Sequence, residues 1–334
     1  MTKFVLVIAI LLLASPVSAK ESLPELKAKM DKIAQDFGGV LGYSLLFRGK
    51  HDERIDFKGD EIFPSASTIK TAIMCEAMHQ VEQGKVEWER RIPVQGEDYR
   101  QEGGFANYFK LDTSLPLDQW VHLMITVSDN TATMNLREFL GQKNVNDWLD
   151  AHGFKNTRLL NGKKCDELGL RPLQQKWGLG MTTPNDQVRL FELIVDGKAG
   201  SPASCDRMLR ILTHQYWDDC ILSQVPPNVH AAAKSGALDH CRSDVAVVDS
   251  PGVSTSSRST PRNRRIRVGC MRMKGTLPSA SSLEWSGSTT TPTIPGAHQQ
   301  GRKNFCRAAS DYGFSAQFNL AIRIPFRLGS RQAM

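Results

Sequence analysis

The sequence lacks the short motifs that mark several common classes of enzyme. Its 334 residues contain no C-x-x-C and no H-E-x-x-H, so no spacing typical of a protein metal site is present. They also contain no Walker-type glycine loop and no G-x-S-x-G turn. We therefore expect neither a metal ion nor a cofactor, and the chemistry must come from ordinary side chains.

Cysteine is present in an odd number, which excludes complete pairing within the chain. The seven cysteines are Cys75, Cys165, Cys205, Cys220, Cys241, Cys270 and Cys306. An exported protein is free to form disulfides, but the sequence assigns no pair.

Long apolar runs are confined to the start of the chain. Lys3 is followed by an apolar run over residues 4–14 and then by the small residues Val17-Ser18-Ala19. This order predicts a secretory signal peptide over residues 1–19, and the run is too short to favour a membrane span. A retained N-terminal anchor is the alternative. We expect an exported protein, periplasmic or secreted, with no stable membrane insertion after the signal is removed.

The excess of positive charge is confined to one end of the chain. The net charge is +7, but residues 251–334 alone carry 11 Arg and 2 Lys against Glu284 and Asp311. The preceding residues hold 29 basic and 33 acidic side chains, so the body of the chain is mildly acidic. The charge of the whole chain therefore does not indicate a nucleic-acid partner, and we expect none. A nucleic-acid-binding tail is a remote alternative, because the tail has few aromatic residues and no recognisable motif.

The stretch from Phe63 to Ala72 holds the first candidate for catalysis. Pro64 and Ser65 end an extended segment and start a helix. Apolar side chains then recur every four residues, as on one face of a helix, at Ile69, Ile73, Ala77 and Val81, before Gly84 closes it. Ser67 in the first turn and Lys70 one turn later therefore share a face.

The pairing of a serine with a lysine has a chemical reason. A serine hydroxyl is a weak nucleophile that needs a nearby base, and a lysine in a crowded, partly dry site can lose its proton to serve as one. The backbone N–H groups at a helix start favour developing negative charge. Ser67 and Lys70 are therefore a candidate nucleophile and base. A lysine on a solvated helix face is the alternative.

Two later triplets complete an ordered set. Ser128-Asp129-Asn130 follows a helical run over residues 120–125, and Lys234-Ser235-Gly236 ends an apolar run over residues 229–233. The order S-x-x-K, S-D-N and K-[ST]-G resembles that of the class A serine β-lactamases and other penicillin-recognising serine hydrolases. The flanks of the second triplet and the segment 178–184 resemble the same family, over roughly residues 25 to 250.

This resemblance implies a role for each member of the set. Ser67 attacks the lactam carbonyl and forms an acyl-enzyme, with Lys70 as its base. Ser128 relays a proton to the leaving nitrogen, and Asn130 binds the amide side chain of the substrate. Asp129 is expected to brace its loop rather than to touch the substrate.

The third triplet is expected to bind the carboxylate of the substrate. Lys234 supplies a positive charge and Ser235 a hydroxyl. Gly236 and Ala237 complete this part of the site, and the N–H groups of Ser67 and Ala237 form the oxyanion hole by resemblance. Taken one at a time, these residues are equally typical of ordinary turns and strand edges.

The residue that activates water for deacylation is expected in a loop. The family uses a glutamate in the pattern E-x-x-L-N, and Glu167 and Leu170 fit it. Arg171 stands where the asparagine is expected, and a guanidinium accepts no hydrogen bond. Arg171 is a candidate partner that would lower the basicity of Glu167. We expect Glu167 to be the general base, with a solvated loop acid as the alternative.

The pattern of elements predicts an α+β fold. Helices are expected over residues 23–37, 65–83, 117–125, 131–140, 145–151, 184–195 and 203–214. Strands are expected over residues 40–47, 54–57, 228–237 and 244–248. Residues 158–180 lack clear periodicity and suit a compact loop. We predict an antiparallel sheet made from both chain ends and flanked by helices, an α/β sandwich, beside an all-helical lobe over about residues 65–210.

The catalytic domain is expected to span residues 20–250. From residue 251 the chain becomes rich in Ser, Thr and Arg, where the family has one more strand, in mid-sheet, and a closing helix. We expect a shifted reading frame near residue 252 and a disordered or improvised tail, with a lineage-specific extension as the alternative. The sheet would then lack its middle strand, although residues 265–273 and 318–324 alternate as strands do.

These observations predict an exported class A serine β-lactamase. Its partner would be a small-molecule β-lactam, and we expect a monomer. A D,D-peptidase is one alternative, favoured if Glu167 is unable to serve. A penicillin-binding or inactive relative with slow turnover is the other.

Overall fold

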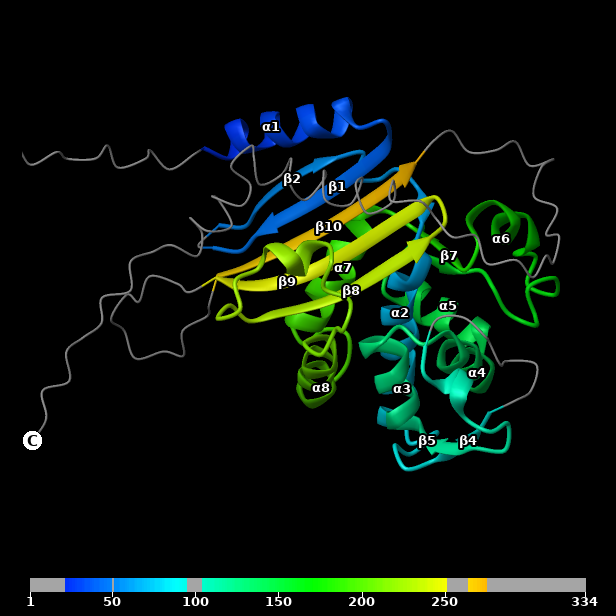
Figure 1. The fold of residues 1–334 in the computed structure, drawn as a ribbon. Coiled ribbons are helices and arrows are strands. Elements are labelled where there is room, and N and C mark those ends of the chain that lie inside the picture. Colours follow the sequence, from blue (N-terminus) through cyan, green and yellow to red (C-terminus); the bar gives the residue numbers. More distant parts are fainter. Residues whose placement is uncertain (1–21, 50, 95–103, 251–263, 275–334) are drawn as a thin grey trace, which may run out of the picture.

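The computed structural model describes residues 22–49, 51–94, 104–250 and 264–274. The expected signal peptide and the expected strand over residues 318–324 lie outside these ranges. The chain forms a five-stranded antiparallel sheet with helices on both faces and a helical lobe at one end (Figure 1). This confirms the predicted α+β fold.

The sheet is built from both ends of the described chain. Its strands, in spatial order, are β2 (Glu53–Phe57), β1 (Gly39–Phe47), β10 (Arg264–Lys274), β9 (Cys241–Ser250) and β8 (Ala231–Leu238). All neighbouring strands run antiparallel. The edge strand β8 carries the third sequence triplet, so the candidate site lies at one edge of the sheet.

The strand β10 overturns one expectation. Its backbone pairs with β1 from Gly39↔Lys274 to Phe47↔Ile266 and with β9 from Ser250↔Arg264 to Cys241↔Met273. The middle of the sheet is therefore filled, and the prediction that it lacks a strand was wrong. The period-two pattern over residues 265–273 was the correct signal for this strand. A central strand needs backbone pairing on both of its edges, and it can have this without a sequence similar to that of the family. The shifted reading frame stays a hypothesis.

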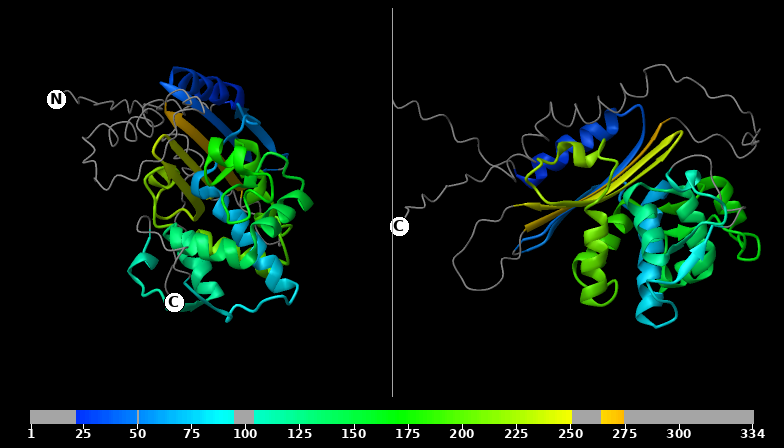
Figure 2. Two further views of the ribbon diagram at one scale, coloured as in Figure 1. Left: turned by 90° about the vertical axis from the view of Figure 1, so that its right-hand side faces the viewer. Right: turned by 60° about the horizontal axis from the view of Figure 1, so that its bottom comes forward.

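Helices cover the two faces of the sheet unequally (Figure 2). The helix α1 (Leu23–Asp36) lies on one face with the short 3-10 helix η4 (Ile221–Gln224), and a capping box between Ser22 and Glu25 starts it. The other face is covered by α7 (Pro184–Val195) and α8 (Pro202–Leu212). No described helix is long and apolar enough to span a membrane.

The helical lobe surrounds α2 (Lys70–Glu82), most of which is fully buried. Its other helices are α3 (Leu117–Thr126), α4 (Asn130–Leu140), α5 (Gln142–Ala151) and α6 (Arg171–Trp177). One hydrophobic core joins this lobe to the sheet face that bears Ala232, Val245 and Val247. The lobe and the sheet edge are therefore packed as a unit.

The segment 158–180 contains more structure than its sequence predicts. The strands β6 (Arg158–Leu159), β7 (Gly180–Thr182) and β3 (Phe63–Pro64) form a small sheet, and α6 occupies seven residues. Elements this short give too few repeats for a periodic signal. A further pair, β4 (Arg91–Pro93) with β5 (Ser114–Pro116), was missed for the same reason.

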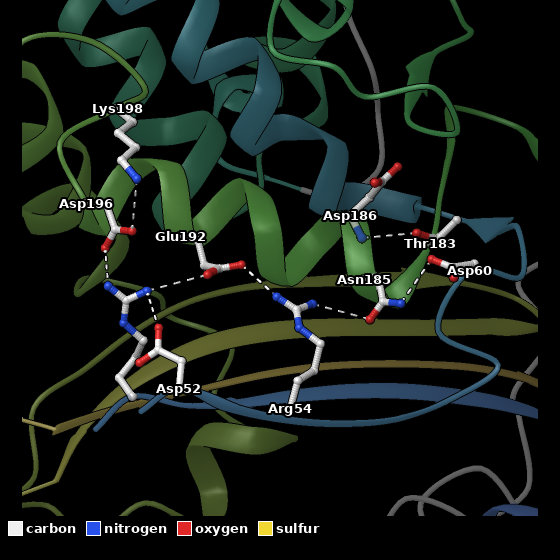
Figure 3. Close-up of polar contacts among 10 residues, drawn as sticks. Asp52, Arg54, Asp60, Thr183, Asn185, Asp186, Glu192, Asp196 and Lys198 are labelled. Atoms are coloured by element: carbon white, nitrogen blue, oxygen red, sulfur yellow. Dashed lines mark hydrogen bonds and ion pairs between the residues drawn. The ribbon is translucent and has the colours of Figure 1, made fainter. Parts of the chain in front are cut away.

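Charged side chains tie α7 to the edge of the sheet (Figure 3). Arg54 Nη2 lies 2.8 Å from Glu192 Oε2, and Arg48 Nη2 lies 3.0 Å from Asp196 Oδ1. At the start of the helix, Thr183 accepts a hydrogen bond from the N–H of Asp186. These contacts fix α7 and, through its N-terminus, the segment that enters it from β7.

Candidate active site

Ser67 lies on a tight turn rather than in the first turn of an α-helix. It belongs to the 3-10 turn η1 (Ala66–Ile69), and Lys70 is the first residue of α2. Ala66 adopts φ +47°, a left-handed conformation that costs a non-glycine residue energy. The Ser65 N–H donates to Gly180 O at 2.8 Å, so β7 holds this strained turn in place. The serine itself is half-buried and reachable from solvent.

Lys70 joins the first two sequence triplets. Its side chain is fully buried, and Nζ donates to Ser128 O at 2.6 Å, to Ser128 Oγ at 3.1 Å and to Asn130 Oδ1 at 2.9 Å. Residues 58 and 60 positions away in the sequence therefore meet at one amine.

Lys234 joins the third triplet to the same place. It is also fully buried, and its Nζ donates to Ser128 Oγ at 3.1 Å and to Ser235 O at 2.7 Å. The Ser128 hydroxyl therefore lies within hydrogen-bond distance of both amines. A proton held at any of the three groups has a short path to the others.

Gly236 brings the edge strand directly onto the nucleophile turn. A Cβ added to it would lie 2.7 Å from Ser67 N and 3.0 Å from Ala66 Cβ. Only glycine allows this approach. Ala237 follows on the same strand and is exposed, while Ser235 is half-buried. The third triplet thus lies directly against the turn that carries Ser67.

Asp129 braces the loop that carries Ser128. It is buried, caps α4 by accepting from the Ala132 N–H at 2.7 Å, and accepts from the Ala106 N–H at 2.8 Å. Ser128 itself has φ +59°, a second strained non-glycine residue. This agrees with the bracing role expected for Asp129, because the strained loop needs external partners to persist.

Burial changes the proton affinity of both lysines. It lowers the pKa of Lys70 well below its usual range, and the positive charge of Lys234 lowers it further. Burial likewise lowers the pKa of Lys234 to about 7. An amine that is partly neutral near pH 7 is able to accept a proton from serine.

Asp244 is a buried acid that the sequence reading missed. It lies on β9 directly opposite Ser235, and its Oδ2 accepts from the Ile221 N–H at 2.8 Å. Burial raises the pKa of Asp244 to about 7. The sequence does contain a sign that Asp244 is buried, because this acid directly precedes the apolar run Val245 to Val248 within one strand.

Within the described ranges, Glu167 makes no hydrogen bond to this cluster. It is exposed in the turns that precede α6, and within the described ranges it has no hydrogen-bond or ion-pair partner. Arg171 binds Asp166 instead, with Nε 2.8 Å from Oδ1 and Nη2 2.6 Å from Oδ2. The suggested pairing of Arg171 with Glu167 is therefore replaced by one with Asp166, whose pKa the hydrogen bonds from Arg171 lower.

The start of the segment 158–180 is held by Arg137, a residue that was not predicted from the sequence. Arg137 of α4 is buried and donates from Nη1 to Asn161 Oδ1 at 2.5 Å and from Nε to Glu138 Oε1 at 2.8 Å. Cys165 is buried as well. The loop is thus attached on its inner side, while the stretch that carries Glu167 faces solvent. In the described ranges no three His, Cys, Asp or Glu side chains are grouped as metal ligands.

Comparisons with known proteins agree on one family. A family model described as the beta-lactamase enzyme family matches residues 25–257. The chain is similar to beta-lactamase PSE-4 and beta-lactamase CARB-3 of Pseudomonas aeruginosa, with 27% and 24% identity over 243 residues. Each alignment covers 70% of this chain and 80% of the relative.

Solved structures share the fold. A beta-lactamase from Sphaerobacter thermophilus matches with a TM-score of 0.65 and 24% identity, over 87% of this chain and 96% of that one. A point mutant of PBP-A, solved as an acyl-enzyme complex with penicillin G, matches with a TM-score of 0.65 and 24% identity, over 76% of this chain and 89% of that one. At this level of identity the likeness shows the fold alone.

Proposed function

Because the chain belongs to the beta-lactamase enzyme family, we propose that it is a serine β-lactamase that hydrolyses the lactam amide through an acyl-enzyme on Ser67. One observation carries the proposal. Two buried lysines from different elements, Lys70 and Lys234, meet at the hydroxyl of Ser128 beside the Ser67 turn. Burying two cations together is costly, and a site that retains this arrangement is a candidate for proton transfer.

Acylation follows from these contacts. The Ser67 oxygen bonds to the lactam carbonyl carbon while its proton passes to Lys70, whose lowered pKa suits a base. The carbonyl oxygen becomes an anion, which the N–H groups of Ser67 and Ala237 stabilise. When the C–N bond breaks, Ser128 gives its proton to the ring nitrogen and takes one from a neighbouring lysine.

Substrate binding uses residues from two elements, β8 and α4. Lys234 and Ser235 bind the substrate carboxylate from β8, with Gly236 and Ala237 continuing the strand. Asn130, the first residue of α4, binds the amide side chain. No step requires a metal ion or a cofactor.

For the deacylation step, we assign Glu167 as the base that activates water. The carboxylate acts only where it reaches the acyl-enzyme, and within the described ranges no hydrogen bond restrains it there. Arg171 replaces the asparagine of the family pattern and binds Asp166, so water positioning differs from that pattern.

A penicillin-binding relative that acylates without efficient turnover is the second candidate. The exposure of Glu167 favours it, because an acyl-enzyme without an activated water persists. A D,D-peptidase would share the same acylation chemistry. Export to the periplasm or medium, a monomeric state and a role in antibiotic resistance are further expectations of the proposal.

Purified protein and a chromogenic cephalosporin separate these candidates. A β-lactamase opens many substrate molecules per protein molecule, whereas a penicillin-binding relative gives a single stoichiometric burst. Ser67→Ala is expected to abolish both signals, and Ser223→Ala, which removes an exposed hydroxyl from another turn, is the control. Activity that survives Ser67→Ala would falsify the assignment of the nucleophile.

A further inference from the structure

The segment Gln215-Tyr216-Trp217, which follows α8, contacts both the end of α3 and the edge strand β8. The Tyr216 N–H donates to Thr126 O at 2.9 Å, and the indole Nε1 of Trp217 donates to Val127 O at 2.9 Å. The Gln215 amide lies 3.4 Å from Ile125 O and 3.4 Å from Ala233 O. These carbonyls belong to the end of α3 and to β8.

These contacts place the segment beside two proposed catalytic residues. Val127 immediately precedes Ser128, and Ala233 immediately precedes Lys234. The last carbonyls of a helix have no partner within it, so the segment satisfies the end of α3 just before the strained Ser128. Its backbone is therefore held in a fixed relation to both.

The two aromatic rings of the segment remain largely outside the core. Tyr216 is 65% exposed and Trp217 is 48% exposed, and their rings meet edge to face with centroids 5.2 Å apart. Large aromatic side chains on an anchored backbone offer contact area at a low cost in conformational entropy. Their exposure on a segment that contacts the neighbours of Ser128 and Lys234 points to contact with a ligand rather than to packing in the core.

The neighbouring residues identify the part of the substrate that these rings would meet. In the proposed function, Ser128 protonates the leaving nitrogen and Lys234 binds the carboxylate on the same ring of the substrate. The segment contacts β8, the strand that carries Lys234, through the Gln215 amide at Ala233 O. We therefore place the rings of Tyr216 and Trp217 beside the carboxylate-bearing ring of the substrate.

We propose that Tyr216 and Trp217 form an aromatic wall that selects β-lactams with a planar aromatic substituent on the ring that carries the carboxylate. The inference rests on the proposed function and names the substrate class of the same site. Asp218 and Asp219 follow and are exposed, so the wall also disfavours an anionic substituent in that place.

Two cephalosporins with the same amide side chain test this inference. One carries an aryl group on the carboxylate-bearing ring and the other a methyl group in the same position, and the rate of acylation is followed by ring opening. Wild-type protein is expected to prefer the aryl compound. Tyr216→Ala keeps every backbone hydrogen bond, and it is expected to lower this preference about tenfold, the size of one aromatic contact.

Two conservative variants separate the wall from a merely structural role. Tyr216→Phe keeps the ring and is expected to keep the preference. Trp217→Phe keeps a ring but loses the N–H bond to Val127 O, so it is expected to slow both compounds equally by loosening Ser128. An unchanged preference in Tyr216→Ala, or equal losses in Tyr216→Ala and Tyr216→Phe, overturns the inference. Failure of wild-type protein to react with either compound overturns the proposed function instead.

Discussion

The two halves of the candidate site differ in how firmly the fold holds them. The residues proposed for acylation are supported by buried groups: Lys70 and Lys234 are fully buried, and Asp129 caps a helix beneath Ser128. The residue proposed for deacylation, Glu167, is exposed on a loop. Both halves come from one family pattern, and only in the first do hydrogen bonds join the proposed residues to one another.

This difference has a physical cause. The acylation residues lie where a sheet edge, a helix start and a helix end meet, so each is restrained by several elements at once. Arg137 holds the beginning of the 158–180 segment, but Arg171 directs its bond to Asp166 on the surface. The fold therefore restrains the acylation residues, whereas no hydrogen bond within the described ranges restrains Glu167, and we expect deacylation to limit turnover.

The largest expected effect concerns the deacylation half of the site, which the fold restrains less. Glu167→Gln should lower the rate of deacylation about 10³-fold, within the range for general bases, while the rate of acylation stays unchanged. Stopped-flow measurement of the burst and of the steady state separates the two rates. Glu89→Gln is the matched control, since it makes the same change at an exposed glutamate outside the site. Equal steady-state rates in wild type and Glu167→Gln would show that the loop carboxylate is not the base.

The next effect concerns the acylation half of the site, which the fold restrains more. Gly236→Ala places a methyl group 2.7 Å from Ser67 N, and a displaced nucleophile should lower acylation about 100-fold. Gly38→Ala is the matched control, because no atom lies within 4 Å of the added Cβ. Acylation at the wild-type rate in Gly236→Ala would contradict the close packing of β8 on the Ser67 turn.

The smallest effect concerns stability rather than rate. Asp244 has a pKa raised to about 7 by burial, so the folded state holds its proton more tightly than the unfolded state does. The unfolding free energy should therefore fall as pH rises from about 4 to 7. Asp244→Asn removes this loss and should stabilise the protein by roughly 2 kcal/mol more at pH 8 than at pH 5.

Urea unfolding at the two pH values measures this effect. The side-chain amide that replaces the carboxylate in Asp244→Asn still accepts from the Ile221 N–H, so the comparison isolates the charge. Equal stabilisation at both pH values would mean that the carboxylate is not the group whose titration matters.

Local spacing made much of the site predictable from the sequence. Ser67 and Lys70 are three residues apart, and the geometry of a helix start then fixes their relation wherever the chain folds. The flanking patterns of the other two triplets placed them correctly at the end of α3 and on an edge strand. The order of all three triplets was the strongest signal for the family.

Contacts between distant segments were beyond the sequence. The pattern of β10 indicated a strand, but nothing local specified that its partners are β1 and β9. The exposure of Glu167 depends on how Arg171 and Asp166 pair, and the burial of Asp244 depends on Ile221 from another segment. Such partners are chosen by tertiary packing, which single-sequence patterns do not encode.

The most direct test of the account is the mass of the protein after mixing with a β-lactam. The account predicts that wild-type protein gains the mass of one intact β-lactam, that the added mass maps to the peptide containing Ser67, and that Glu167→Gln retains it for longer. Absence of any adduct in both proteins, or an adduct on a different residue, would contradict it.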